Sequence, residues 1–270
     1  MMQVIGICRF SYPAEGGVQR EHKSLEERCA YLYDPTRLNV RFNCLETLTL
    51  PSIRAQSDAD FTFAILIGDS LPEAAKDRLK TLTADIPQVQ IIERESGPYR
   101  QITQEVIDSL RLPDAELCAQ FRLDDDDAVG LQFVEDIRTV TEKSSGLLDF
   151  GGKMAVDFST GFAVRPGKDG LRAALLHQQL WTPGLAIVMR PHSKRSILNY
   201  GHHKLHQEMP TVTIPDKNMF VRSFHGDNDS LAVRIGATYD YQSLDEFTVQ
   251  YFKETFNIDN DAVKAAWSDD

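Results

Sequence analysis

The sequence lacks any apolar run long enough to cross a membrane. No stretch approaches the roughly 18 consecutive apolar residues that a bilayer-spanning helix needs. The first residues, MMQVIGICRFSY, form too short an apolar stretch and turn polar too early for a secretory signal peptide. We therefore expect a cytoplasmic protein with no transmembrane segment, although contact with a membrane surface stays open.

Cysteine and positive charge are also scarce. The four cysteines (Cys8, Cys29, Cys44 and Cys118) include no CxxC pair. Cys8 and Cys118 lie in apolar runs, where a free thiol behaves as a small hydrophobe, and this usage is typical of a reducing compartment. The formal net charge of −11 argues against nucleic acid as a main partner, because such a partner needs a basic face.

The first half of the chain alternates strand and helix patterns. Apolar runs rich in β-branched residues predict buried strands at 3–10, 61–69, 88–93 and 115–123. Helical patterns lie between them, after Asp34-Pro35, at 71–85 and at 97–110. We expect a long polar loop over 11–34. Alternation of this kind predicts an α/β fold, Rossmann-like in its first half, with a mainly parallel central sheet.

The second half has a more irregular pattern. Residues 145–166 suggest short strands joined by glycine turns, and 211–224 suggest a strand pair broken at Pro215. A further strand is expected at 185–190, and two helices near 243–256 and 260–267. Because no linker or repeat interrupts the chain, we expect one domain over 1–270.

Four consecutive aspartates follow the fourth strand, in QFRLDDDDAVGLQF (120–133). Ligands of open parallel sheets bind at the carboxyl ends of the strands, where this run lies. Adjacent carboxylates repel one another unless a cation joins them, and Mg²⁺ and Mn²⁺ prefer oxygen ligands. On an extended backbone Asp124 and Asp126 point to one side, and Asp125 and Asp127 to the other. The run therefore favours a divalent-cation site, with the remaining aspartates capping the next helix.

Three competing hypotheses for the aspartate run are weaker. A helix–loop–helix calcium loop starting at Asp124 would have Glu135 correctly at its twelfth position, but Val129 at the sixth, where glycine belongs. An aspartyl-phosphate phosphatase also uses D-x-D after a strand, but here no Gly-Thr follows and the strand is not the first. An acidic helix start accounts for one aspartate more readily than for four.

Several segments together resemble a known bacterial family. They are RFSY (9–12), YDPTRLNVRFNCLETLTLPSIRAQSDADFTFAILIGDSLP (33–72), QFRLDDDDAV (120–129) and HGDNDS (225–230). Over most of its length the chain is similar to the bacterial family of putative rhamnosyltransferases. Its fourth strand with D-x-D resembles the nucleotide-sugar-binding half of the type-A glycosyltransferase fold.

This resemblance implies a metal-dependent glycosyltransferase. It would move a sugar, with rhamnose as a candidate, from a nucleotide-diphosphate sugar to a carbohydrate or other hydroxyl-bearing acceptor, with Mn²⁺ or Mg²⁺ as cofactor. Residues 1–127 would bind the donor, and 128–270 would bind the acceptor and supply the catalytic base. Two alternatives stay open: a metal-dependent nucleotide phosphohydrolase, and a non-catalytic module that binds a nucleotide or a divalent cation.

The resemblance also implies roles for the aspartates. Asp126 would be the direct metal ligand, and Asp124 would contact the ribose or the sugar. Asp125 and Asp127 would support them, Asp125 on the donor side. In the second half, His225 of SFHGDNDS (223–230) would be the second protein ligand of the metal.

Four further residues would bind the donor. Arg9 and Arg122 end strands and could reach the diphosphate, although a strand arginine that faces solvent is an equal alternative. Asp69 could accept a hydrogen bond from a base N–H, or it could simply be a turn residue in GDSLP. Arg100 opens a helix at the nucleotide edge.

The base that deprotonates the acceptor would be an aspartate of the second half. Asp227 is the first candidate, with Asp229 beside it, and Asp157 in AVDFSTG competes with them. Loop aspartates also commonly form turns without any catalytic role.

Two other patterns are ambiguous. His202 and His206 have the i, i+4 spacing of a metal-binding helix, but the stretch favours an exposed polar helix because no glutamate of an H-E-x-x-H motif lies between them. GGVQREHK (16–23) could be a lid over the donor or an ordinary loop.

Overall fold

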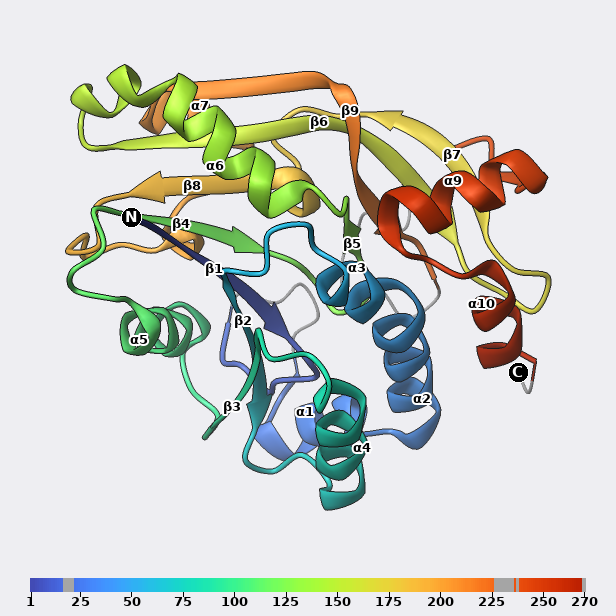
Figure 1. The fold of residues 1–270 in the computed structure, drawn as a ribbon. Coiled ribbons are helices and arrows are strands. Elements are labelled where there is room, and N and C mark those ends of the chain that lie inside the picture. Colours follow the sequence, from blue (N-terminus) through green and yellow to red (C-terminus); the bar gives the residue numbers. More distant parts are fainter. Residues whose placement is uncertain (17–21, 226–235, 237, 269–270) are drawn as a thin grey trace.

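The computed structural model describes residues 1–16, 22–225, 236 and 238–268. Its described strands form one sheet, with the order β10-β7-β6-β8-β4-β1-β2-β3 and with β9 running beside β6 and β5 (Figure 1). The strands are β1 (Met2–Arg9), β2 (Thr62–Gly68), β3 (Val89–Arg94), β4 (Leu117–Arg122), β5 (Ala128–Val129), β6 (Lys153–Arg165), β7 (Arg172–His177), β8 (Leu185–Met189), β9 (Thr211–Ser223) and β10 (Gln242–Ser243).

The first four strands confirm the expected alternation. Strands β3, β2, β1 and β4 lie side by side and are all parallel. The helices described are α1 (Leu25–Leu32), α2 (Pro35–Cys44), α3 (Leu50–Arg54), α4 (Glu73–Thr83), α5 (Tyr99–Leu110), α6 (Phe133–Lys143), α7 (Leu205–Glu208), α9 (Glu246–Phe256) and α10 (Asn260–Ala266). The predicted mixed α/β class with a mainly parallel central part is therefore confirmed.

The start of α2 forms as its sequence predicts. The Asp34 carboxylate accepts hydrogen bonds from the backbone N–H groups of Thr36 and Arg37, and Pro35 occupies the first helical position. A π-helical turn over Leu45–Thr49 then joins α2 to α3 without a break. The polar stretch before α2 is not all loop, because it contains α1, whose N-cap is Ser24.

The second half extends the sheet with antiparallel strands. Strand β8 pairs antiparallel with β4, and β6 pairs antiparallel with β8. The expected chain of short strands over 145–166 is wrong: 145–149 form a 3-10 helix, and 153–165 form one strand of 13 residues. A long strand is stable here because β6 is paired on both edges, by β8 and β9 in its first part and by β7 and β9 in its last part.

Pro215 does not split β9 into two strands, as the sequence had suggested. Strand β9 runs unbroken past the proline, while its register against β6 shifts between Phe158 and Thr160. The Thr160 hydroxyl donates a hydrogen bond to the carbonyl of Pro215 at 2.7 Å. A proline is tolerated because it lies in this irregular stretch, where no ladder N–H is required.

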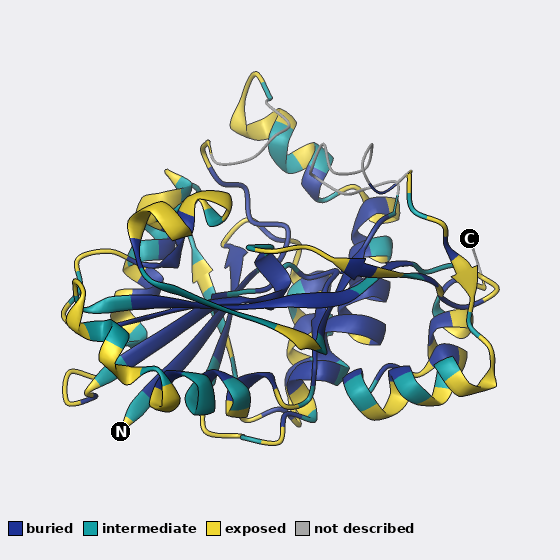
Figure 2. Ribbon diagram, turned by 90° about the horizontal axis from the view of Figure 1, so that it is seen from above, coloured by how far each residue is buried: buried dark blue, intermediate teal, exposed yellow. Residues whose placement is uncertain are grey.

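Helices cover both faces of the sheet. Residues of α2, α3, α4 and α6 form one apolar core with the strands, while α5 and the segment 197–209 form the core of the opposite face. Helices α9 and α10 pack against β6, β7 and β9 at one end of the sheet. Figure 2 shows the buried strands in the centre and the exposed residues on the surrounding helices and loops.

The described helices include none that is long and apolar enough to cross a membrane. Cys8, Cys44 and Cys118 are buried.

Gly161 permits the close approach of β6 and β9. A Cβ at this position would overlap the backbone oxygen and the ring of Phe220. We expect Gly161→Ala to lower the free energy of unfolding by about 1–3 kcal/mol, as overpacking of a tight core does. Urea denaturation measures the effect.

Gly167→Ala is the matched control. Among the described residues, no heavy atom lies within 4 Å of a Cβ built there. Equal stability of the two variants would contradict a close contact between the strands at Gly161.

Candidate metal and donor site

The carboxyl ends of the parallel strands form the edge at which the aspartates lie. Arg9 ends β1, Asp69 follows β2, and Arg122 ends β4, one residue before Leu123. Because β1, β2 and β4 are parallel neighbours, these side chains start from the same edge of the sheet.

The aspartate run is a turn and not an extended segment. The backbone N–H of Asp127 donates to the carbonyl of Asp124 at 3.1 Å. Asp124, Asp126 and Asp127 therefore each place one carboxylate oxygen within 4.8 Å of the others. The expectation that Asp127 points away from Asp124 and Asp126 is wrong, because it assumed an extended backbone.

The aspartates also do not cap the following helix. Strand β5 comes between, and α6 begins at Phe133 with Gln132 as its N-cap and no side-chain cap. An acidic helix start therefore does not account for the run.

Arg41 of α2 pairs with two of the aspartates. Its Nε donates to Asp125 at 3.1 Å, and its Nη1 donates to Asp126 at 3.0 Å. A further contact joins Arg41 Nη2 to the other oxygen of Asp125, which makes this pair bidentate. Asp125 and Asp126 are only 1% and 3% exposed, so their charge would be costly without this partner.

Arg222 of β9 pairs with the other two. Its Nη1 donates to Asp124 Oδ2 at 3.0 Å and also contacts Asp127 Oδ2. Asp127 is completely buried, and its Oδ1 accepts a hydrogen bond from the backbone N–H of Ser223 at 3.1 Å. The four aspartates and the two arginines thus form one charge network, which ties α2 and β9 to the end of β4.

Nearby cations decide the protonation of two aspartates. Burial acts to raise the pKa of Asp126, but Arg41 and His225 outweigh it and hold that pKa well below its usual range. Burial is likewise outweighed at Asp124, whose pKa is lowered chiefly by Arg222. Both groups are therefore carboxylates at neutral pH.

Asp127 differs from them. Complete burial raises its pKa well above the usual value, the charges of Asp126 and Asp124 add to the rise, and Arg222 offsets it only in part.

The residues of this cluster fit a divalent cation. Three carboxylate oxygens within 4.8 Å of one another can be bridged by a single ion, and oxygen is the donor that Mg²⁺ and Mn²⁺ prefer. His225 brings Nε2 to 2.9 Å from Asp126 Oδ2. The structure thus places the two predicted metal ligands, Asp126 and His225, next to each other.

The other predicted donor residues differ in how close they come to the cluster. Arg9 is half-buried, helps to lower the pKa of Asp124, and lies over the Tyr99 ring with its guanidinium carbon 5.2 Å from the centroid. Asp69 is exposed and accepts a hydrogen bond from the backbone N–H of Ser70 at 2.8 Å, as a turn residue does. Arg100 is exposed in the first turn of α5.

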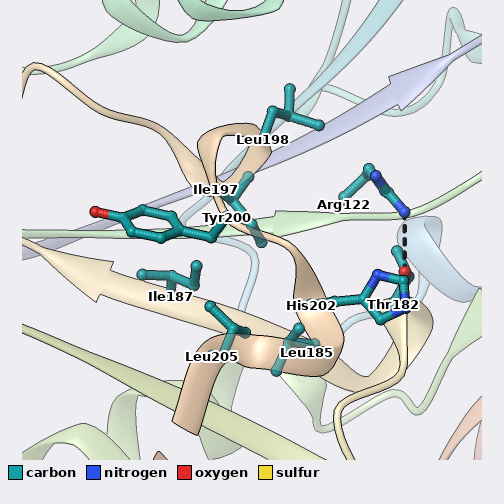
Figure 3. Close-up of a pocket in the computed structure, with 9 residues that line it drawn as sticks. All are labelled: Arg122, Thr182, Leu185, Ile187, Ile197, Leu198, Tyr200, His202 and Leu205. Carbon is teal, nitrogen blue, oxygen red and sulfur yellow. Dashed lines mark hydrogen bonds between the residues drawn. The ribbon is translucent and has the colours of Figure 1, made fainter. Parts of the chain in front are cut away.

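Arg122 lines a small pocket beside the cluster, together with Thr182 and Tyr200 (Figure 3). Its Nη2 donates to the hydroxyl of Thr182 at 2.9 Å. His202 also lines this pocket and is half-buried, whereas His203, Lys204 and His206 are exposed, as expected for this polar segment. Leu205, in the middle of that segment, packs into the core.

The candidates for the catalytic base fall in different parts of the chain. Asp157 is fully buried in β6, where it accepts hydrogen bonds from the Leu180 N–H at 2.9 Å and the Thr213 hydroxyl at 3.0 Å. Burial raises the pKa of Asp157. Asp227 and Asp229 lie outside the described residues, as does much of the stretch 16–23 that was considered as a lid.

Sequence reasoning missed the two arginines that neutralise the aspartates. The signal for Arg41 was its position between Leu38 and Leu45 on the buried stripe of a helix, where a charge needs a partner. Arg222 lies similarly in a buried stretch of β9. Neither position shows which acid is the partner, because the paired residues are more than 80 positions apart.

We expect Arg41→Met to lower the free energy of unfolding by about 3–5 kcal/mol. The substitution leaves Asp125 and Asp126 buried without their main cation, and an uncompensated buried charge is strongly destabilising. Chemical denaturation measures the loss. The double variant with Asp125→Asn should recover part of the stability, because one of the two orphaned charges is removed.

Arg54→Met is the matched control, since Arg54 pairs with Asp85 on the surface at 2.8 Å. A surface pair contributes at most about 1 kcal/mol. Losses of the same size in Arg41→Met and Arg54→Met would show that the buried network does not hold the aspartates.

Comparison with solved structures gives similarities at low sequence identity. S. aureus TarS 1–349 is 10% identical with a TM-score of 0.40, over 98% of this chain and 70% of that chain. The same protein in complex with UDP-GlcNAc is 11% identical with a TM-score of 0.44, over 93% and 73%. With TM-scores below 0.5, these likenesses carry no functional argument.

A third solved structure covers all of this chain. It is described as a putative nucleotide-diphospho-sugar transferase from Desulfovibrio desulfuricans G20, and it is 10% identical with a TM-score of 0.34, over 100% of this chain and 95% of that chain. No curated protein matches the sequence. The assignment therefore rests on the family model described as "Putative rhamnosyl transferase", which matches residues 3–237. Because this match covers most of the sequence, including β1 to β9 and all four aspartates, the chain belongs to that family.

Proposed function

We propose that this protein is a metal-dependent glycosyltransferase. It moves a sugar, with rhamnose as the first candidate, from a nucleotide-diphosphate donor to an acceptor hydroxyl. The observation that carries the proposal is the convergence of Asp124, Asp126 and Asp127 at the carboxyl end of β4, with carboxylate oxygens within 4.8 Å. Membership of the rhamnosyl transferase family supports the same reaction class.

Asp126 and Asp124 would hold Mn²⁺ or Mg²⁺, with His225 completing the set of protein ligands. When bound, such an ion supplies Lewis-acid stabilisation to the charge of a diphosphate. Arg9 and Arg122 are half-buried and lie within electrostatic reach of Asp124. Their fixed positive charge would act on the same leaving group, where charge develops as the sugar departs.

The reaction that follows from this arrangement is a substitution at the anomeric carbon. The bond from this carbon to the diphosphate oxygen breaks, and its electron pair leaves with the diphosphate. The acceptor oxygen forms the new bond, and its proton passes to a carboxylate base. The sugar develops oxocarbenium character on the way.

Asp227 is our first candidate for this base. The contacts of Asp157 support a positioning role for that residue. Both oxygens of Asp157 accept hydrogen bonds, one from the residue before Trp181 and one from β9. It thereby fixes the short segment that carries Thr182, the partner of Arg122. Asp69 and Arg100 remain candidates for the nucleoside end of the donor.

Product analysis separates this function from its two alternatives. A nucleotide phosphohydrolase would release phosphate without requiring an acceptor. A binding module would bind the nucleotide with no turnover. A transferase yields free nucleotide diphosphate and a glycosylated acceptor in equal amounts.

We expect Asp126→Ala to abolish metal-dependent donor binding. Titration calorimetry with UDP, GDP and dTDP, each with and without Mn²⁺, measures this, and the wild type should bind at least one of them more tightly with the metal. His225→Ala should reduce the increase in nucleotide affinity that Mn²⁺ causes but should not abolish it, because the carboxylate ligands remain.

Asp85→Asn is the control, since Asp85 is an exposed carboxylate on the loop after α4. Binding that still depends on Mn²⁺ in Asp126→Ala would rule out Asp126 as the ligand.

We further expect Asp227→Asn to lower kcat by about 10²-fold or more, with the donor KM nearly unchanged, as loss of a general base does. Asp157→Asn should instead alter KM for the donor more than kcat, because it loosens the segment that orients Arg122. Transfer of a radiolabelled sugar measures both constants. The reverse pattern would identify Asp157 as the base.

A further inference from the structure

One long run of the second half carries positive charge only. Residues 170–207 contain five lysines and arginines and no aspartate or glutamate. The whole chain has 40 acidic residues among 270, about one in seven, so a stretch of this length would ordinarily contain several. The cations of this run therefore have no acid beside them in the sequence with which to pair.

Three of these cations gather where β8 ends. Arg190, Lys194 and Arg195 are exposed, and none of them forms an ion pair in the part of the chain that the structure describes. A fourth cation, Lys153 at the start of β6, lies opposite the last residue of β8. It adjoins Arg190, whose Nε lies 3.9 Å from a Cβ built on Gly152.

The ring of Tyr200 joins two of these cations. Lys153 Nζ donates to the Tyr200 hydroxyl at 3.2 Å and lies 4.8 Å from the centroid of the ring. The guanidinium carbon of Arg195 lies 5.7 Å from the same centroid. Figure 3 shows that the Tyr200 hydroxyl points away from Arg122. We call Lys153, Arg190, Lys194, Arg195 and Tyr200 the cationic patch.

Two exposed apolar side chains flank the cationic patch. Phe150 is 72% exposed and lies three residues before Lys153. Leu112 is 47% exposed and follows Arg111, whose Nη2 donates to the carbonyl of Arg195 at 2.6 Å. Unpaired cations and exposed apolar side chains therefore occur together on this surface.

The cationic patch lies at the edge of the sheet opposite the aspartates. Met189 at the end of β8 pairs both with Lys153 and with Cys118, near the start of β4. The aspartates follow the other end of β4. Figure 1 shows the start of β4 and the arrowhead of β8 on the side of the molecule where the N-terminus lies, and α9 on the other side. A partner bound at the patch would not compete with a ligand of the aspartates.

We propose that the cationic patch docks this protein on the surface of an anionic phospholipid bilayer. A chain with a net charge of −11 is repelled by such a surface, unless it presents a face on which cations lack acidic partners. The lipid phosphates would pair with the lysine and arginines, and Tyr200, Phe150 and Leu112 would lie at the level of the headgroups. The aspartates would then face away from the bilayer, open to a ligand from solution. This inference does not depend on the proposed function.

Sedimentation with lipid vesicles tests the proposal on the full chain. The wild type should sediment with vesicles of phosphatidylcholine and phosphatidylglycerol in equal parts, but not with phosphatidylcholine alone, and added salt should weaken the binding. The triple variant Arg190→Gln, Lys194→Gln and Arg195→Gln should lower the partition coefficient about 100-fold, because each cation near an anionic surface contributes about fivefold.

The matched control is the triple variant Lys80→Gln, Lys168→Gln and Lys264→Gln. These three lysines are exposed and lie in α4, in the turn between β6 and β7, and in α10. The control changes the net charge by the same amount, and it should retain vesicle binding.

A second pair of variants tests the apolar part of the surface. Phe150→Ala should lower the partition coefficient severalfold, because it removes a ring that would lie among the headgroups. Phe247→Ala removes an 80% exposed ring from α9, and it should leave vesicle binding unchanged.

Three results would overturn the proposal: no wild-type binding to the mixed vesicles at low salt, equal binding to phosphatidylcholine alone, or equal losses in the two triple variants. Binding of soluble polyphosphate without binding to vesicles would also overturn it, and would assign the patch to a soluble polyanion. Affinity for nucleotide diphosphates should be the same in all these variants. A failure of vesicle binding therefore leaves the proposed function standing.

Discussion

The structure depends on the neutralisation of four consecutive aspartates, three of which are almost entirely removed from water. Burial of such a run is unfavourable by itself, because the cost of desolvating each charge adds to their mutual repulsion. Arg41 from α2 and Arg222 from β9 offset this cost with direct hydrogen bonds to all four residues. The same contacts join the parallel half of the sheet to the antiparallel half, so the site and the fold share one network.

This network also explains why the cluster can serve a ligand. Asp126 and Asp124 stay ionised because cations lower their pKa, while Asp127 is held in the interior. The carboxylates are thus fixed in place before any ligand arrives, which reduces the reorganisation that binding requires.

Local patterns predicted much of the fold, and contacts between distant residues account for most of what they missed. Strand–helix alternation and the Asp34-Pro35 helix start depend on neighbours in sequence and were right. The length of β6 and the passage of β9 through Pro215 depend on strands paired across the sheet. The sequence predicted a cation site at the aspartate run, but it predicted neither the turn geometry of the run nor its arginine partners, which come from α2 and β9.

The most direct measurement is the anomalous scattering of Mn²⁺ in crystals of the protein grown with a nucleotide diphosphate. We expect one manganese peak within coordination distance of an oxygen of Asp126, with the diphosphate of the nucleotide bound to the same ion. A diphosphate held by Arg9 and Arg122 with no manganese at Asp126 would contradict the metal role of the aspartates. The aspartates would then serve only as ion-pair partners of Arg41 and Arg222.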